Sequence, residues 1–456
     1  MRVDSLPLLE TIFVAVVMVL FVMLGGAHGE DGVWTLDQAL AHALAHNPDL
    51  AENAANIEVA EQTRREVFGN FLPQLTGTAG YQYVDNVPAM EINIEPDLAI
   101  PNVPPIVIEK TVEMGDHDNW KAELALEQVL FASGRVYYGH QAASHRVDAA
   151  RLQNEALRVA VARQTAEAFL GVLISQQVFE AQSESLARAQ AHLKHVQNRF
   201  DAGAASRFEF LRAQVEVDNI EPEVSRARQA IALAGEGFRR AMGLSPDAPV
   251  QVTGKLATQK VDPNKSAARQ KARAGRAEFD AYQAGEKAYR SAAGGRLGEM
   301  LPAVMLTGTY GYQKPYYFDA DGDTNWTVGA GIQIPLFDGL KAYRGREANL
   351  ARAAGMRRAR QRFSADVENQ ISAAILGLDE ADVRIQTTQA NVDRALTMVG
   401  IAEESYAHGA LTSLDVIDAQ LAATGARLAH LRALYDYRVA KVRLAAATGD
   451  LQAIGR

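Results

Sequence analysis

Residues 405–420 read SYAHGALTSLDVIDAQ, and residues 199–214, which lie 206 positions earlier, read RFDAGAASRFEFLRAQ. Both stretches contain an aromatic residue, a Gly-Ala pair, a hydroxyl residue, an acidic residue and Ala-Gln in the same order. Glycine tolerates the positive φ that ends many helices, and a Ser or Thr side chain caps the start of a following helix. We therefore predict two tight turns, each at the tip of a helical hairpin, in a duplicated chain.

Further matches extend the duplication along the chain. Leu72-Pro73 corresponds to Leu301-Pro302 at an offset of 229 residues, whereas Leu130-Phe131 corresponds to Leu336-Phe337 at an offset of 206. The offset falls because the first repeat has more residues between these matches, and insertions belong in surface loops. We predict two domains, a first repeat over residues 30–255 and a second over residues 256–456.

Helical composition dominates both repeats. The stretch from about 134 to 200 contains no proline and is rich in Ala, Leu, Gln, Glu and Arg. As one helix it would be about 100 Å long at 1.5 Å per residue, so it must pack lengthwise against other helices. After the first turn we expect a second helix that runs back to Gly243, followed by a linker over 245–265. A single helix near 267–299 is expected to open the second repeat.

Four short segments instead alternate between apolar and polar residues, which is typical of β-strands with one apolar face. We expect these strands at about 74–84, 119–129, 303–313 and 325–335. The region from Val84 to Asn119 is rich in Pro, Asp and Glu and is expected to be a long loop.

The apolar faces of these strands carry aromatic residues near the loops, where a membrane-interface belt would lie. The predicted interface residues are Tyr81, Tyr83, Trp120, Tyr310, Tyr312 and Trp326. Four strands cannot close a barrel, and open sheet edges are excluded from lipid, so several chains would have to contribute; three would give twelve strands. The alternative is a soluble sandwich with its core on the same face.

The N-terminus and the composition restrict the compartment and the class of protein. Residues 12–24 are apolar and are followed by small residues, a pattern typical of a secretory signal peptide over residues 1–29; an uncleaved anchor is the alternative. The net charge of −9 argues against a nucleic-acid partner, and the absence of cysteine excludes disulfides and thiolate chemistry.

In this order of motifs the chain resembles the TolC-like outer membrane efflux proteins. The resemblance is carried by WTLDQALAHALAHNPDL near the start, FLPQL before the first strand, QVLFASG and IPLFDG after later strands, and the two tips. It implies a mainly α-helical homotrimer whose small transmembrane β part forms a 12-stranded barrel on an α-helical barrel. It also implies an outer membrane location in a Gram-negative bacterium, a periplasmic adaptor protein as partner and an inner-membrane pump of RND or ABC type.

The resemblance also assigns roles at the tips. It implies a gate formed by Tyr406, Asp415, Asp418 and, in the first tip, Glu209. Asp415 and Asp418 share a helix face, so a trimer would place six carboxylates around one opening, where clustered acids raise one another's pKa. Leu411 stands where a gate arginine is expected, so a salt bridge through that residue is absent. The implied adaptor-docking residues are Gly203, Ala204, Gly409, Ala410 and Leu411.

Other motifs are weaker. Asp319–Asp323 resembles part of a calcium loop but lacks its order, and His42 and His46 have no third metal ligand nearby in sequence. We therefore predict no metal, no cofactor and no catalytic centre. The predicted function is a passive outer-membrane exit duct for efflux or type I secretion. The rival is a periplasmic coiled-coil scaffold without a pore.

Overall fold

The computed structural model describes residues 33–94, 108–113, 116–256, 258, 264–315 and 321–455. The predicted signal peptide, residues 1–29, lies outside them. The chain divides into two compact units, and each takes residues from both predicted repeats. The helical unit comprises Met1–Asn56, Ala150–Ala281 and Ala359–Arg456, and the sheet unit comprises Ile57–Ala149 and Tyr282–Arg358.

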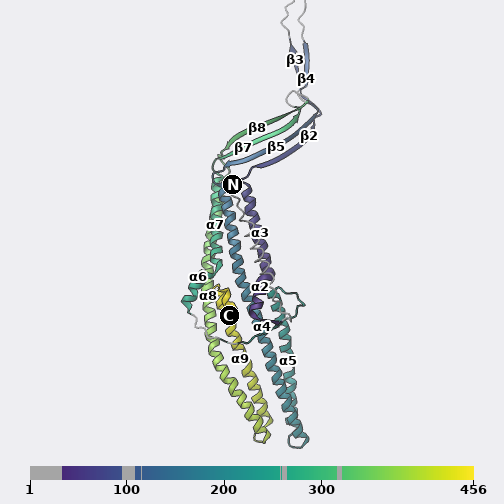
Figure 1. The fold of residues 1–456 in the computed structure, drawn as a ribbon, viewed down its shortest axis with the longest axis vertical. Helices are drawn as coiled ribbons and strands as arrows, with labels where there is room; N and C mark the ends of the chain where they lie inside the picture. The colour runs from purple at the N-terminus through teal and green to yellow at the C-terminus, as the bar shows by residue number, and fades with distance from the viewer. Residues whose placement is uncertain are drawn as a thin grey trace, which may run out of the picture. The chain divides into compact units, whose positions relative to one another are not determined.

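The sheet unit contains a four-stranded antiparallel sheet in the order β2-β5-β7-β8 (Figure 1). Its strands are β2 (Gln74–Tyr83), β5 (Asp118–Phe131), β7 (Ala303–Lys314) and β8 (Asp323–Gln333). The β2 and β8 strands are the edges of this sheet. A mainly helical chain with a small β part is therefore confirmed as the fold class.

The strand register gathers the apolar residues on one face of the sheet. Tyr81 pairs with Trp120, Leu124 pairs with Tyr310, and Tyr310 pairs with Trp326. Residues that pair across antiparallel strands point to the same side. These side chains are exposed in the single chain, so this face lacks a covering layer among the described residues.

The expected loop over Val84–Asn119 was wrong in part. It contains a second antiparallel pair, β3 (Ala89–Ile94) with β4 (Ile108–Glu113), drawn above the sheet in Figure 1. The physical reason is local: Met90 and Ile92 alternate with polar residues, whereas most prolines of the region fall between the two strands in sequence. The abundance of proline across the whole region obscured this alternation.

The helices have the following bounds. They are α2 (Leu36–His46), α3 (Pro48–Gly69), α4 (Arg135–Asp201), α5 (Arg207–Met242), α6 (Lys265–Gly275), α7 (Ala277–Gly298), α8 (Lys341–Ala407), α9 (Ser413–Ala447) and α10 (Leu451–Ile454). The linker contains β6 (Gln251–Val252), which pairs in parallel with β1 (Val33–Trp34). The single helix expected over 267–299 was wrong, because Arg276 has an extended backbone that separates α6 from α7.

A hydrophobic core fills the centre of the helical unit. It joins side chains from α2, α4, α5, α9, α10 and the short strands, and its larger members are Trp34, Leu40, Phe169, Leu170, Phe238, Met242, Val439, Val442 and Ile454. The Thr35 capping box starts α2 in this core, and the left-handed glycines Gly243 and Gly449 follow α5 and α9. This core fixes the part of each long hairpin that is distant from its tip.

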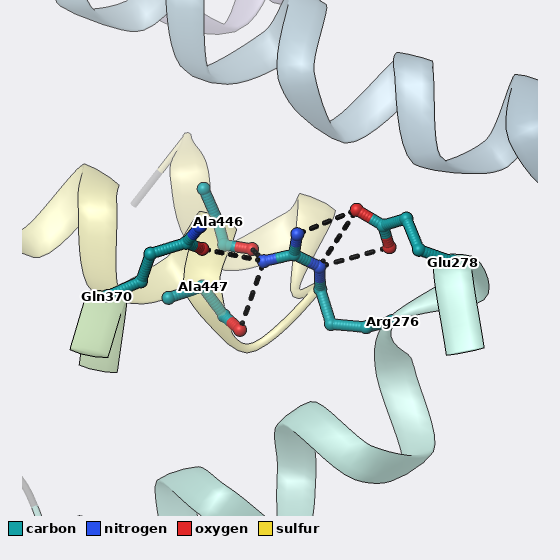
Figure 2. A network of polar contacts seen from close by, with 5 residues as sticks. All are labelled: Arg276, Glu278, Gln370, Ala446 and Ala447. Carbon is teal, nitrogen blue, oxygen red and sulfur yellow. Dashed lines mark hydrogen bonds and ion pairs between the residues drawn. The ribbon is translucent and has the colours of Figure 1, made fainter. Parts of the chain in front are cut away.

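The ends of α5 and α9 are held by two equivalent arrangements, which we call the repeat joints. In the first, Asn47 Nδ2 donates to the Ala241 carbonyl oxygen at 2.9 Å. In the second, Arg276 Nη1 donates to the carbonyl oxygens of Ala446 and Ala447 at 3.3 and 3.4 Å (Figure 2). Asn47 and Arg276 are 229 residues apart, and Ala241 and Ala447 are 206 apart, so the duplication also accounts for the joints.

Each joint requires a glycine. Gly243 and Gly449 both have a φ of 73°, and a Cβ on Gly449 would lie 2.5 Å from the Gly275 carbonyl oxygen. We expect Gly449→Ala to lower the free energy of unfolding by about 2–4 kcal/mol through backbone strain and this clash. Thermal unfolding of the detergent-solubilised protein, followed by circular dichroism, measures the change.

Gly425 provides the matched control for this prediction. It lies inside α9, and a Cβ there would meet nothing within 4 Å. Gly425→Ala should leave stability unchanged or raise it by about 0.5–1 kcal/mol. Equal unfolding temperatures for the two variants would contradict the assignment of Gly449 as a required left-handed residue.

Candidate functional site at the hairpin tips

The two hairpin tips have the same backbone geometry. Gly203 and Gly409 have φ values of 75° and 77°. The Ala204 N–H donates to the Arg199 carbonyl at 2.7 Å, and the Ala410 N–H donates to the Ser405 carbonyl at 2.9 Å. These bonds satisfy carbonyl groups that the helix ends would otherwise leave unpaired.

Two of the predicted gate acids are occupied as helix caps. Glu209 accepts a hydrogen bond from the Ser206 N–H at 3.1 Å, and Asp415 accepts bonds from the Thr412 N–H and hydroxyl at 2.8 and 2.6 Å. The Thr412 hydrogen bonds lower the pKa of Asp415. Within one chain this direction is opposite to the rise expected from clustered acids, because capping stabilises the charged form.

Tyr406 is buried rather than presented at the surface; only 3% of it is exposed. Its ring lies 5.3 Å from the His192 ring, and the Arg199 guanidinium lies 4.8 Å from its centroid. Arg199 Nη1 also donates to the Tyr406 carbonyl oxygen at 2.8 Å. Tyr406 therefore joins the end of α8 to the end of α4 within one chain.

Buried polar contacts also join the two hairpins above the turns. His192 Nε2 lies 2.8 Å from Ser413 Oγ, and both residues are buried. Farther along, Ser185 and Thr424 share a hydrogen bond of 2.9 Å. Since a buried polar group is costly when unpaired, these pairs fix how α4 and α9 align.

Sequence reasoning assigned no role to His192, His195 or Arg199, although Arg199 opens the first tip stretch. They stand at positions i, i+3 and i+7 in the last turns of α4, so they share one helix face, and all three contact Tyr406. That spacing was readable in the sequence. The contact with Tyr406 could not be read from the sequence, because Tyr406 belongs to the other repeat.

The predicted docking residues and the third gate acid are placed at the surface. Gly203, Ala204, Gly409, Ala410 and Leu411 are all exposed. Asp418 is exposed as well, on the first turns of α9. The pKa of Glu216 on α5 is raised, mainly by burial and also by the negative charge of Asp418.

The His192 contact predicts a pH dependence of tip packing. Burial and the neighbouring His195 lower the pKa of His192 below its ordinary value of 6.5, while Glu403 acts in the opposite direction. Because the packed state favours neutral imidazole, packing is strongest above pH 6.5 and weakens as the pH falls below it. The rate of hydrogen exchange of the tip amides, corrected for intrinsic rates, should therefore increase as the pH is lowered from 7.5 to about 5.5.

His192→Gln removes the titrating group but keeps a donor for Ser413, so it is the matched control. The pH-dependent part of the exchange should disappear in this variant. An unchanged pH profile would assign the effect to other groups, such as the tip acids.

The predicted membrane-interface aromatics lie together on the apolar face of the sheet. The Tyr81 and Trp120 rings are 4.7 Å apart, and the Tyr81 hydroxyl donates to Asp118 Oδ1 at 2.6 Å. The Tyr312 hydroxyl donates to the Asp321 carbonyl oxygen at 3.1 Å. The phenol oxygens thus bond toward the loops while the rings cover the apolar face, as interface aromatics do.

Among the described residues, no group of three or more His, Asp or Glu side chains is placed to hold a metal ion. The His42 and His46 rings stack with centroids 4.3 Å apart. The Asp319–Asp323 segment lies partly outside the described residues. The helices that the structure describes include none with the length and hydrophobicity needed to cross a bilayer.

An exposed apolar sheet face combined with two long helical hairpins defines a class of membrane-associated export protein. The family model described as "Outer membrane efflux protein" matches residues 39–244 and 268–450. The chain belongs to this family. An outer membrane location and a role as an efflux channel follow from it.

Named relatives agree with this assignment. The chain is 23% identical over 428 residues to the outer membrane efflux protein BepC of Brucella suis biovar 1, covering 92% of this chain and 86% of BepC. It is 26% identical over 349 residues to the alkaline protease secretion protein AprF of Pseudomonas aeruginosa, covering 72% and 69%. Its fold matches the CmeC outer membrane channel of Campylobacter jejuni with a TM-score of 0.74, at 17% identity, covering 91% and 85%.

Proposed function

We propose that the chain forms a homotrimeric exit duct, in which three copies close a 12-stranded barrel through the outer membrane. The observation that carries this proposal is the sheet itself. Its apolar face is exposed and its edges, β2 and β8, have no further partner strand among the described residues. Lipid does not tolerate open strand edges, so β2 of one copy must pair with β8 of the next.

The test is to measure mass and conductance on the same preparation. Light scattering of the detergent-solubilised protein should give three copies, and planar bilayers should show ion conductance. A monomer that stays soluble after cell fractionation would favour the rival, a periplasmic scaffold without a pore. Trimers that remain non-conducting under all conditions would contradict the duct.

The partners follow from the same proposal. A passive duct in the outer membrane has no energy source, so an inner-membrane pump of RND or ABC type and a periplasmic adaptor would supply transport. The exposed glycine and alanine residues of the two tips would allow an adaptor helix to approach closely. Pull-down of the cross-linked inner-membrane partner would identify the pump type, on which the cargo depends.

We place the gate at the periplasmic tips and assign its charge to Asp415 and Asp418. In a trimer these exposed acids would give six carboxylates around one opening and favour cations. Replacing both with Ala should reduce cation preference and weaken block by divalent cations. Reversal potentials in a salt gradient measure the preference, and an unchanged value would contradict the assignment.

The two acids are separable because only Asp415 is a helix cap. Asp415→Asn removes charge and weakens the capping box, costing about 1 kcal/mol of local stability, whereas Asp418→Asn removes charge alone. A selectivity change in both variants, with loosening of the tip only in the Asp415 variant, would separate the gate role from the capping role.

A further inference from the structure

The polar face of the sheet carries two large apolar residues at its helix-proximal end. Elsewhere on this face the strands present small or polar side chains, among them Thr76 and Thr78 of β2 and Thr307 of β7. Val129 of β5 and Met305 of β7 interrupt this pattern and pair with each other across the two strands. Residues that pair directly across antiparallel strands point to the same side, so these two form one apolar floor.

A hollow of about 400 Å³ lies over this floor, and all of its lining residues belong to the sheet unit. Its walls come from the end of α3 and the start of α4, with Val67 and Val136 as apolar members. The floor residues Val129 and Met305 are half-buried in the single chain. Clefts of this size that are lined mainly by apolar side chains, with a few polar groups among them, are typical sites for small organic molecules.

Two charged residues of opposite sign also line the hollow. Glu127 precedes Val129 on the same face of β5, and Arg135 opens α4. Neither the Glu127 nor the Arg135 side chain has a hydrogen-bond or ion-pair partner among the residues that the structure describes. Farther along the same face, by contrast, Lys121 and Glu123 neutralise each other at 3.0 Å. Glu127 and Arg135 therefore remain available to a ligand that carries both charges.

We propose that this hollow binds a small zwitterionic organic molecule with an apolar body, as a contact site for cargo in transit. The apolar body lies on Val129 and Met305. The anionic group pairs with Arg135, and the cationic group pairs with Glu127. The proposal rests on the barrel of the proposed function, because the polar face lines an interior only where the barrel closes. Since a duct has to release what it binds, binding is weak and exchange is rapid.

The absence of cysteine from the chain allows the site to be tested by protection of single introduced thiols. Gln74→Cys places a thiol at the hollow, because Gln74 lines it and pairs with Glu127 across the strands. Thr78→Cys is the matched control, since Thr78 lies on the same face of β2 and is exposed like Gln74 but does not line the hollow. The rate of alkylation of the full-length trimer by a water-soluble maleimide is measured with and without ligand.

Three dansyl compounds with the same aromatic body separate the two charges. They are the zwitterion Nε-dansyl-lysine, the cation dansylcadaverine and the anion dansyl-6-aminohexanoate. We expect the zwitterion to slow alkylation at position 74 at a concentration about threefold lower than either of the others, since a partly exposed ion pair contributes about that factor. Alkylation at position 78 should not change. Absence of protection at position 74, or equal protection at both positions, would overturn the proposal.

Further substitutions in the Gln74→Cys background assign the two charges. Arg135→Gln should remove the advantage of the zwitterion over the cation, and Glu127→Gln should remove its advantage over the anion. Lys121→Gln combined with Glu123→Gln is the charge-matched control on the same face and should leave all three half-protecting concentrations within about twofold. An advantage that survives the matching substitution would overturn the assignment of that charge. So would an equal weakening of all three compounds, which a structural role alone would produce.

The apolar floor and the barrel are tested separately. Met305→Thr continues the threonine pattern of β7 and should raise all three half-protecting concentrations by about fourfold, the factor for one buried methylene group; unchanged concentrations would overturn the floor. In lipid vesicles, Val328→Cys on the apolar face should react with the maleimide much more slowly than Thr78→Cys. Equal rates for these two variants would contradict the barrel, whereas slow reaction at position 328 without protection at position 74 would overturn the binding site alone.

Discussion

Arg276→Ala is expected to lower the free energy of unfolding of the helical unit by about 3 kcal/mol or more. The Arg276 side chain is only 11% exposed, and its guanidinium forms three hydrogen bonds of 2.6–3.1 Å with the Glu278 carboxylate. It also donates to Gln370 of α8 and to the last carbonyls of α9 (Figure 2). Removal leaves a partly buried carboxylate and two helix-end carbonyls without this partner, and each such group left unpaired costs about 1–3 kcal/mol.

The control for this variant is an arginine whose ion pair is exposed. Arg269 binds Glu368 at 2.5 Å, but both side chains are substantially exposed, so Arg269→Ala should cost less than about 1 kcal/mol. Arg276→Lys keeps the charge but cannot reach Glu278, Gln370 and α9 together, so it should rescue only part of the loss. Thermal unfolding of the three variants measures the order, and equal losses in Arg276→Ala and Arg269→Ala would contradict the role of the joint.

The same joint shows why the fold was largely predictable from the sequence. The duplicated arrangement of helices and strands was predicted from residues that match between the two repeats. Gly409 matches Gly203, and the strand pattern repeats as well. The break at Arg276 was missed because the residue itself is an ordinary helix former. Its equivalent, Asn47, stands before Pro48, and an Asn-Pro pair is a typical signal for the start of a helix. Applying the repeat offset to that position would have placed the break.

Prediction of the site from sequence was weaker, for a physical reason. Asp415 and Glu209 were predicted as gate residues from the tip motifs, yet each also belongs to a local capping box. Gating and helix capping both use an acidic residue at this position, so the sequence does not distinguish them. The gate role of Tyr406 stays a prediction; within one chain Tyr406 packs on α4. Contacts between repeats depend on how two long hairpins align, and the pattern within one helix does not contain that alignment.

Arg199→Ala is expected to shift the tips toward an open arrangement by about 30-fold. The residue contributes a charge-assisted hydrogen bond to the Tyr406 carbonyl and a cation–π contact with its ring, together about 2 kcal/mol. A tenfold change in an equilibrium constant corresponds to about 1.4 kcal/mol. Because both contacts join α4 to α8, any opening that separates the two hairpins must break them. Open probability in single-channel recordings should rise accordingly.

Arg212 offers the matched control, because its guanidinium lies 5.7 Å over the ring of Phe208 on the same helix. Arg212→Ala removes an exposed cation near the tip but no contact between hairpins, so open probability should stay within about twofold of wild type. Arg199→Lys keeps the charge without the planar stacking and should lie between the two. If Arg199→Ala and Arg212→Ala behave alike, net charge at the tip sets the opening equilibrium. If only Arg199→Ala opens the channel, the contact between Arg199 and Tyr406 holds the tips closed. Leu411 cannot do so through a salt bridge, because its side chain has no charge.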